Sequence, residues 1–176
     1  MRNQYTYGGA QSENDIQALG AILGHAFGFR AEGAVTWLDE TGREHVRVVR
    51  LGAEVVGGLI VVPMGQWFGG RRVSIQGIAG VGVRADMRRR GVATALMGEA
   101  LREAATSGAH LSTLFASNQV LYRGVGYEQA GSRFLGVLRP DSLRFDDRQL
   151  HLKLFEAADE ETIASVYGRY APKHAG

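Results

Sequence analysis

The segment from Val81 to Leu96 places the strongest constraint on how this chain can fold. It reads VGVRADMRRRGVATAL, which predicts a strand, a short basic turn and then a helix. Gly91 lets the backbone come close to a ligand, and the first turn of the following helix points its unpaired N–H groups at the same place. Arg88, Arg89 and Arg90 add positive charge suited to phosphate. We therefore predict an anion site at this turn, with pyrophosphate as the anion.

The spacing of this turn excludes two common phosphate loops. The chain has no G-x-x-x-x-G-K-[ST] motif, and no G-x-G-x-x-G follows an early strand. What stands here is R-x-x-G-x-A, formed by Arg88, Gly91 and Ala93. This pattern resembles the acetyl-CoA pyrophosphate loop of the GCN5-related N-acetyltransferase (GNAT) superfamily. A basic, solvated start of a helix is the alternative interpretation of the loop taken alone.

A second motif lies downstream at the spacing of the same superfamily. Residues 110–117 read HLSTLFAS, a predicted strand, and residues 118–127 read NQVLYRGVGY, a short helix with a Tyr-x-x-x-Gly-Tyr ending. The resemblance implies that Tyr122 lies near the sulfur of CoA and protonates the departing thiolate. A core tyrosine with a satisfied hydroxyl is the alternative.

The resemblance also implies which residues bind acetyl-CoA. Backbone groups at Val81 and Val83 would hold the acetyl group and the pantetheine arm, the Arg-rich turn would hold the pyrophosphate, and Ser117 would lie near the cofactor. The full set of predicted acetyl-CoA residues is Val81, Gly82, Val83, Arg88, Arg89, Arg90, Gly91, Val92, Ala93, Thr94 and Ser117.

Several segments resemble one branch of the superfamily more closely. Residues 62–70, 77–83, 91–97 and 111–117 are similar to the first domain of the enhanced-intracellular-survival acetyltransferases, which acetylate amines, notably on aminoglycosides. Members of that branch are about twice as long and have a second acetyltransferase-like domain. Their C-terminus is thought to take the proton of the amine. On this basis we expect an acetyltransferase domain over 1–157 and a C-terminal helix over 158–176 that either docks on this domain or begins a missing second one.

The periodicity of the chain predicts a mixed α/β (α+β) domain, in which a mostly antiparallel sheet is flanked by helices in a GNAT fold. The 176 residues suffice for one core. Gly52-Ala53 predicts a tight hairpin, and Pro63 predicts a break in the strand that contains it. The expected elements are a helix over 12–27, an irregular stretch over 28–37, strands over 46–51, 54–62 and 73–83, a break over 63–70, a helix over 94–106, strands over 110–117, 127–138 and 149–155, and a helix over 159–170.

Charge and composition narrow the partners. Residues 71–102 contain seven arginines against two acidic residues, a balance of +5, whereas the rest of the chain is −3. A nucleic-acid surface is an alternative, but no ladder of aromatic side chains accompanies the arginines. The chain has no cysteine, no signal-peptide core and no apolar run that spans a bilayer. We expect a cytoplasmic protein with no metal, nucleic-acid or membrane partner; a homo-oligomer is compatible with the sequence.

The predicted reaction is direct attack of a substrate amine on the thioester, without a covalent enzyme intermediate. An N–H near Val81 would polarise the thioester oxygen, and Tyr122 would be the general acid. For the general base the sequence offers Glu32, Glu44, His25 or a water molecule. His25 lies near the apolar face of its helix, where a core histidine is the favoured interpretation.

Four residues are predicted to bind the acceptor amine. Trp37 corresponds to an aromatic residue that lines the amine pocket of the branch, and Gly80 stands where that branch can carry a bulky aromatic, so the pocket should be wider here. Glu32 would pair with a cationic amine, or be a solvated charge, and Phe27 is either a pocket residue or plain core.

The identity of the amine is open at this level. An aminoglycoside is favoured by the branch resemblance, while a polyamine or a protein amine is the alternative within the enzyme interpretation. A regulatory module that binds acetyl-CoA without turnover is the alternative outside it.

Overall fold

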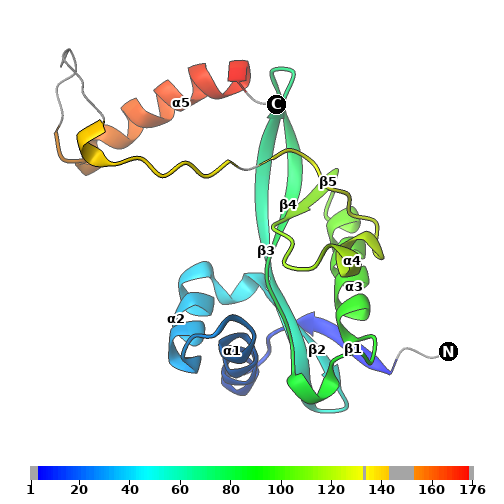
Figure 1. The fold of residues 1–176 in the computed structure, drawn as a ribbon. Helices are drawn as coiled ribbons and strands as arrows, with labels where there is room; N and C mark the ends of the chain where they lie inside the picture. The colour runs from blue at the N-terminus through cyan, green and yellow to red at the C-terminus, as the bar shows by residue number, and fades with distance from the viewer. Residues whose placement is uncertain (1–3, 133, 143–152, 175–176) are drawn as a thin grey trace.

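A computed structural model of the chain describes residues 4–132, 134–142 and 153–174. Its elements follow one another from an N-terminal strand to a C-terminal helix (Figure 1). The strands are β1 (Tyr5–Gly9), β2 (Val46–Leu51), β3 (Glu54–Phe68), β4 (Arg71–Val83) and β5 (Leu111–Leu114); the helices are α1 (Glu13–Phe27), α2 (Ala31–Thr41), α3 (Val92–Thr106), α4 (Gln119–Arg123) and α5 (Glu160–His174), with 3₁₀ turns at Arg43–His45, Ala85–Met87, Pro140–Ser142 and Ala157–Asp159.

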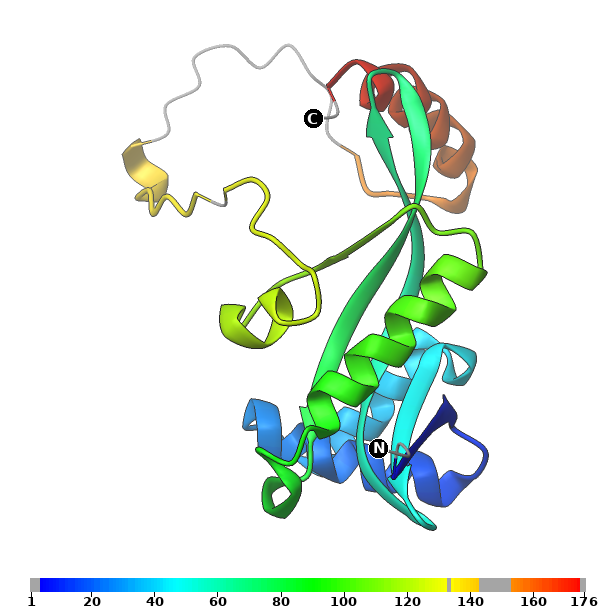
Figure 2. The ribbon, with the colours of Figure 1, turned by 90° about the vertical axis from the view of Figure 1, so that its right-hand side faces the viewer.

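The sheet has the strand order β1-β2-β3-β4-β5. Its first three pairings are antiparallel, and β4 and β5 are parallel, joined through α3. Helices α1 and α2 cover one face of the sheet and α3 the other, as two views at right angles show (Figures 1 and 2). This arrangement confirms the predicted mixed, mostly antiparallel sheet flanked by helices.

Each face of the sheet has its own apolar core. Ile16, Leu19 and Leu23 of α1 are buried against the sheet on one side, and Leu96 and Met97 of α3 on the other. Fully burying one such side chain contributes about 1.5–3 kcal/mol, so the helices are held mainly by these faces. Within the described residues, no helix combines the length and apolar character needed to cross a bilayer.

The start of α1 is as the sequence predicts. Ser12 caps the helix: its Oγ accepts a hydrogen bond from the Asp15 N–H at 3.2 Å, and the Asp15 carboxylate accepts one from the Ser12 N–H at 3.1 Å. Arg50 on β2 donates to the same carboxylate at 2.8 Å. This reciprocal capping box fixes where the chain leaves β1 and enters the helix.

The prediction of an irregular stretch over 28–37 is wrong, because α2 begins at Ala31. No side chain caps this helix, so the usual start signal is missing from the sequence. Its packing depends on a close approach to α1: a Cβ at Gly20 would lie 2.5 Å from Cγ2 of Val35, and one at Gly24 would lie 2.8 Å from the Phe29 carbonyl oxygen. Tertiary contact at these two glycines therefore stabilises α2, a helix that no local sequence signal predicts.

The predicted break over 63–70 is also wrong. Strand β3 continues through Pro63, which pairs with Gln76, and ends at Phe68. Strand β2 reaches no further than Ile60 along β3, so Pro63 lies on an open edge, where its missing N–H costs no ladder hydrogen bond. The turn comes later, at Gly69 and Gly70, both with positive φ.

The C-terminal third differs most from the sequence-based expectation. The predicted helix over 159–170 is present as α5, but residues 127–132 and 134–138 form no strand. Of the last predicted strand, residues 149–152 lie outside the described residues and 153–155 are not strand. A strand requires a hydrogen-bonded neighbour, and these segments have none among the described residues. The predicted strand over 110–117 is shorter than expected, and β1 was missed.

Candidate active site

Strand β4 contains a bulge that redirects its second half. Gly58 of β3 pairs with Gly82 and Ile60 pairs with Ala79. One residue of β3 therefore lies opposite two residues of β4. Gly80, at the bulge, has a φ of 56°, and a Cβ there would lie 2.9 Å from Cη2 of Trp37. Both the left-handed backbone and the close Trp37 ring require glycine.

Strand β4 has two neighbouring strands only along its first half. Pairing with β5 runs only from Ile75 to Ile78, opposite Leu111 to Leu114. The following residues, 79–83, pair with β3 alone, while the chain after Leu114 turns toward α4. Backbone N–H and C=O groups on this open edge are unpaired by any strand of the described sheet, so they can pair with an extended ligand that contains amides.

The open edge leads directly into the arginine-rich turn. Gly91, with a φ of 80°, is the N-cap of α3, and no side chain caps the helix there. The first N–H groups of the helix thus remain available to an anion. Arg89 is also left-handed, with a φ of 61°, and it alone among the described non-glycine residues has a positive φ.

The charges of this turn are free for a ligand. Arg84, just before it, is occupied by Glu54 at 2.8 Å and Asp86 at 2.7 Å. Arg88, Arg89 and Arg90 are exposed, and no ion pair of the described part of the chain includes them. The loop is anchored from the other side, because the Tyr5 hydroxyl donates to the Arg90 carbonyl oxygen at 2.8 Å. We conclude that the turn is an ordered, positively charged helix start.

Tyr122 lies on α4, across from the open half of β4. Asn118 caps this short helix by accepting from the Val120 N–H at 3.0 Å. Tyr122 is 7% exposed and packs into the α3-side core. Burial raises the pKa of the Tyr122 hydroxyl, and a hydrogen bond with Ser117 opposes that change. The structure therefore joins Tyr122 and Ser117, and the buried hydroxyl is protonated at neutral pH.

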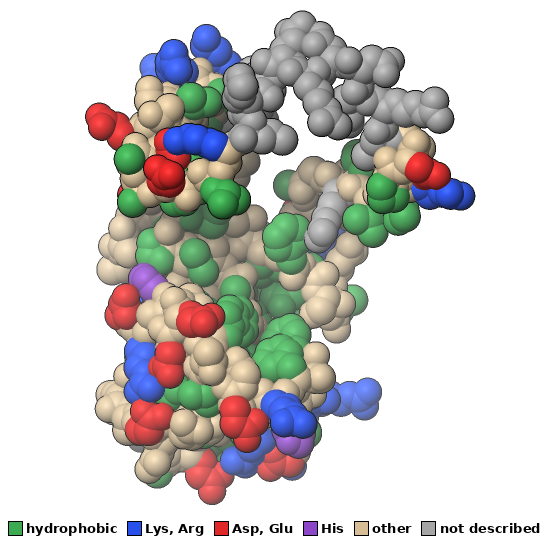
Figure 3. All heavy atoms as spheres, turned by 90° about the vertical axis from the view of Figure 1, so that its left-hand side faces the viewer, with side chains coloured by type: hydrophobic (Ala, Val, Ile, Leu, Met, Phe, Trp, Pro, Cys, Tyr) green, Lys and Arg blue, Asp and Glu red, His purple; other side chains and the backbone are tan. Residues whose placement is uncertain are grey.

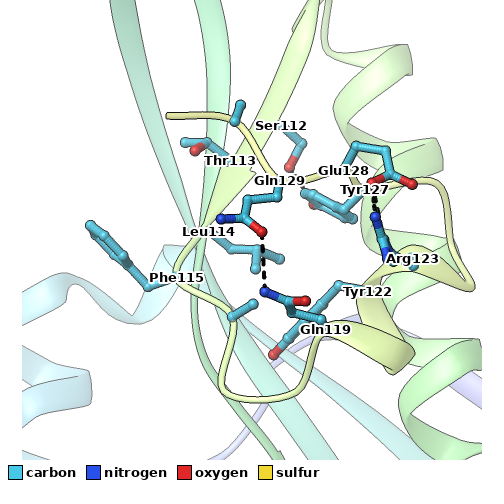
Figure 4. A pocket seen from close by; sticks show the side chains of 12 residues that line it. Ser112, Thr113, Leu114, Phe115, Gln119, Tyr122, Arg123, Tyr127, Glu128 and Gln129 are labelled. Atoms are coloured by element: carbon cyan, nitrogen blue, oxygen red, sulfur yellow. Dashed lines mark hydrogen bonds and ion pairs between the residues drawn. The ribbon is translucent and has the colours of Figure 1, made fainter. Parts of the chain in front are cut away.

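A cavity of about 270 Å³ lies beside this tyrosine (Figure 4). Its walls are β5, α4 and the segment after Tyr127. Besides Tyr122 and Tyr127, it is lined by Ser112, Thr113, Leu114, Phe115, Ala116, Gln119, Arg123, Glu128, Gln129 and Ala130. The segment after Tyr127 is not among the predicted site residues, although the Tyr-x-x-x-Gly-Tyr motif ends at its start.

The predicted acceptor residues lie on the α1–α2 side. Trp37 is partly buried and lies beside Gly80, so these two predicted acceptor residues are neighbours. Phe27 is 50% exposed and stacks on Phe29 at 5.9 Å between ring centroids, so it is not a core residue. Glu32 lies exposed in the first turn of α2.

The candidates for a general base occupy the same side. His25, expected in the core, is instead exposed in the last turn of α1. Glu44 is exposed and lies 3.7 Å from His45. Neither position is enclosed, so the structure singles out no one of them as a base.

The two sides of the molecule differ in charge. Residues 13–45, which include α1 and α2, contain six acidic residues against two arginines. Figure 3 faces this side and shows acidic side chains spread over the two helices. The arginine-rich turn, by contrast, belongs to the +5 segment. An anion and a cation would therefore be attracted to different sides of β4.

Comparison with known proteins identifies a family that matches this chain. The sequence model described as "Acetyltransferase (GNAT) domain" matches residues 10–130. No protein with a curated description matches the chain.

Three solved structures are similar over most of the described chain. A GCN5-related N-acetyltransferase from Anabaena variabilis has 40% identity and a TM-score of 0.69, over 72% of this chain and 32% of that one. One from Kribbella flavida has 32% identity and a TM-score of 0.63, over 70% and 33%. Eis1 from Mycobacterium abscessus has 25% identity and a TM-score of 0.59, over 70% and 31%. The chain thus spans about a third of the length of each of these proteins.

Proposed function

Because this chain belongs to the GNAT acetyltransferase family, we propose that it transfers the acetyl group of acetyl-CoA to a primary amine of a small cationic substrate, with an aminoglycoside as the favoured acceptor. The observation that supports this proposal is that Tyr122 and Val92, at the start of the uncapped helix α3, belong to one core cluster, against which Val81 and Val83 of the open half of β4 pack.

The residues of these three features fit acetyl-CoA. The unpaired backbone edge at Val81–Val83 matches the two amides of the pantetheine arm, which can add to a sheet edge as a strand does. Arg88–Arg90 and the N–H groups of residues 91–94 suit the pyrophosphate, and Ser117 lies beside the proposed acid. When bound, acetyl-CoA supplies the thioester that the amine attacks.

The catalytic roles follow from which groups can hold or release a proton. Tyr122 keeps its hydroxyl proton at neutral pH because burial raises its pKa, so it can donate that proton to the departing sulfur. A backbone N–H near Val81 would polarise the carbonyl oxygen. The described site offers no enclosed base, so solvent can accept the proton of the ammonium before attack.

The charge distribution supports a cationic acceptor. The α1–α2 side is acidic, and Glu32 and Glu40 on α2 are exposed without an ion pair among the described residues. A polycation would be drawn toward this face while CoA occupies the basic side. The Trp37 ring lies against Gly80, so the glycine makes room for this ring and does not widen the acceptor pocket as the sequence predicts. The charges of this face favour an aminoglycoside or a polyamine over a neutral amine.

The proposal is tested by thiol release from acetyl-CoA with a panel of aminoglycosides, polyamines and a lysine peptide, using wild type and Tyr122→Phe. We expect turnover with an aminoglycoside and a loss of about 10²-fold in kcat in the variant, the usual size of a general-acid contribution. Because the pKa of Tyr122 is raised, the alkaline fall in kcat should lie above pH 10. Tyr167→Phe, which alters an exposed tyrosine of α5, is the matched control.

Three results would count against the proposal. Equal kcat in wild type and Tyr122→Phe would remove the tyrosine from the mechanism. Tight binding of acetyl-CoA with no turnover on any amine would favour a regulatory binding module. Binding of nucleic acid that weakens steeply with salt and needs no CoA would favour the alternative use of the arginines.

A further inference from the structure

A chain of hydroxyl contacts connects the centre of the sheet to the tyrosine pair. Gln76 on β4 faces Ser112 on β5 in the parallel register, and Ser112 Oγ donates to the Gln76 carbonyl oxygen at 2.9 Å. Ser112 Oγ lies 2.5 Å from Tyr127 Oη. A serine hydroxyl has one hydrogen, and Gln76 receives it. The Tyr127 hydroxyl must therefore be the donor to Ser112.

Tyr127 in turn contacts Tyr122 in two independent ways. Its backbone N–H donates to the Tyr122 carbonyl oxygen at 3.0 Å. The two rings meet edge to face, with centroids 6.1 Å apart and planes at 75°. Tyr127, Tyr122 and Ser112 all line the cavity beside the proposed acid (Figure 4). One contact thus fixes the Tyr122 backbone and the other fixes its ring.

The element that holds Tyr122 needs such support. Helix α4 has five residues, too few to be stable without tertiary contacts. Its other links to the segment after Tyr127 are exposed: Arg123 pairs with Glu128 at 2.8 Å, and Gln119 donates to Gln129 at 3.4 Å. Exposed pairs of this kind contribute little. Tyr122 itself packs into the α3-side core, and the half-buried Ser112–Tyr127 contact is the hydrogen bond that ties its partner Tyr127 to the sheet.

We propose that Tyr127 is a positioning residue, which transmits the position of β5, through Ser112, to the Tyr122 ring and so sets where the Tyr122 hydroxyl stands. The inference rests on the proposed function, in which Tyr122 is the general acid. The role of Tyr127 differs from that of Tyr122. The Tyr127 hydroxyl is anchored on Ser112, while the Tyr127 ring restrains the Tyr122 ring.

The kinetic test uses Tyr127→Phe, Ser112→Ala and the double variant, with Tyr167→Phe as control and Ser112→Thr as the conservative variant that keeps the hydroxyl. Loss of the anchor should lower kcat about ten-fold, because small misplacements of a reacting group are costly, and leave the KM for acetyl-CoA within about two-fold, since the pyrophosphate turn is untouched. The double variant should lose no more than either single one. The alkaline limb of kcat should move to lower pH as Tyr122 becomes hydrated, and Ser112→Thr should stay near wild type.

A second measurement does not depend on turnover. The protein is labelled with 3-fluorotyrosine, and the ¹⁹F resonance of Tyr122 is assigned from its absence in Tyr122→Phe. We expect Tyr127→Phe and Ser112→Ala to shift this resonance in the same direction, and Tyr167→Phe to leave it unmoved. If wild type shows no turnover, the proposed function fails. The Tyr122 resonance still tests whether Ser112 and Tyr127 set the position of the Tyr122 ring. An unmoved Tyr122 resonance, or an unchanged kcat in an active enzyme, overturns the positioning role.

Discussion

The two halves of β4 differ in how many neighbours they have. From Ile75 to Ile78 the strand lies between β3 and β5, and both isoleucines are buried. From Ala79 to Val83 it pairs with β3 alone. The first half is structural, and the second exposes an edge of hydrogen-bonding groups toward Tyr122 and the start of α3.

The two halves also differ in their glycines, which are Gly77 in the first and Gly80 and Gly82 in the second. Gly77 sits in regular pairing, opposite Val62, whereas Gly80 is left-handed and lies at the shift in register with β3. The second half thus combines an irregular pairing on one edge with a second edge that no strand of the described sheet covers.

The largest expected effect is a difference in unfolding free energy between truncations in the two halves of β4. Ile78→Ala removes a side chain that is 6% exposed in the α3-side core, and should lower the free energy of unfolding by about 3 kcal/mol. Val81→Ala, at a partly buried position past the bulge, should lower it by about 1 kcal/mol. Urea unfolding with linear extrapolation measures both values. Equal losses would mean that the second half is packed as tightly as the first.

A smaller effect tests the bulge itself. Gly80→Val adds a side chain to a left-handed residue and pushes it into the Trp37 ring, whereas Gly69→Val, at a φ of 52°, meets only open space. The second variant therefore measures the backbone cost alone, about 1–2 kcal/mol. We expect Gly80→Val to cost about 2 kcal/mol more, and Trp37→Ala in the same chain to recover most of that excess. If the two glycine variants unfold at the same urea concentration, Trp37 does not restrain the bulge.

The smallest expected effect lies in the turn that follows the open half. Arg89→Gly relieves a left-handed φ of 61° and should raise the free energy of unfolding by about 0.5–1 kcal/mol. Arg90→Gly removes the same charge without that relief and should lower it slightly. Both variants should weaken acetyl-CoA binding, measured by calorimetry at two salt concentrations. A loss of stability in Arg89→Gly would show that its conformation is not strained.

Local signals were sufficient for part of the fold. The start of the first helix at Ser12, the turn at Gly52-Ala53 and the helix after Gly91 all appear where the sequence predicts them. Helix α2 could not be found in this way, because it lacks a capping side chain and is stabilised by α1. The extension of β3 through Pro63 depends on where β2 ends, which no local pattern reveals.

The site shows the same division. The arginine-rich turn before α3 and the order of the two motifs could be predicted, because each depends on neighbouring residues and on a family resemblance. The contact between Gly80 and Trp37 joins residues 43 positions apart, and the Ser112–Tyr127 hydrogen bond joins β5 to the segment after α4 beside a cavity. Such pairings depend on the assembled sheet. The sequence therefore singled out Gly80 and Trp37 without their contact, and it did not single out Ser112.

The parallel pairing of β4 with β5 also bears on how the proposed site comes into existence during folding. The other strand pairs of the described sheet are antiparallel, and two of them, β2–β3 and β3–β4, close through two-residue turns. Strand β5, in contrast, is joined to β4 through the whole of α3, a crossover whose closure entropy slows its formation. The open half of β4 and Tyr122 should accordingly come together late, after the hairpins are in place. Under the proposed function, acetyl-CoA would bind only chains that have completed this last step, and its binding would stabilise the crossover.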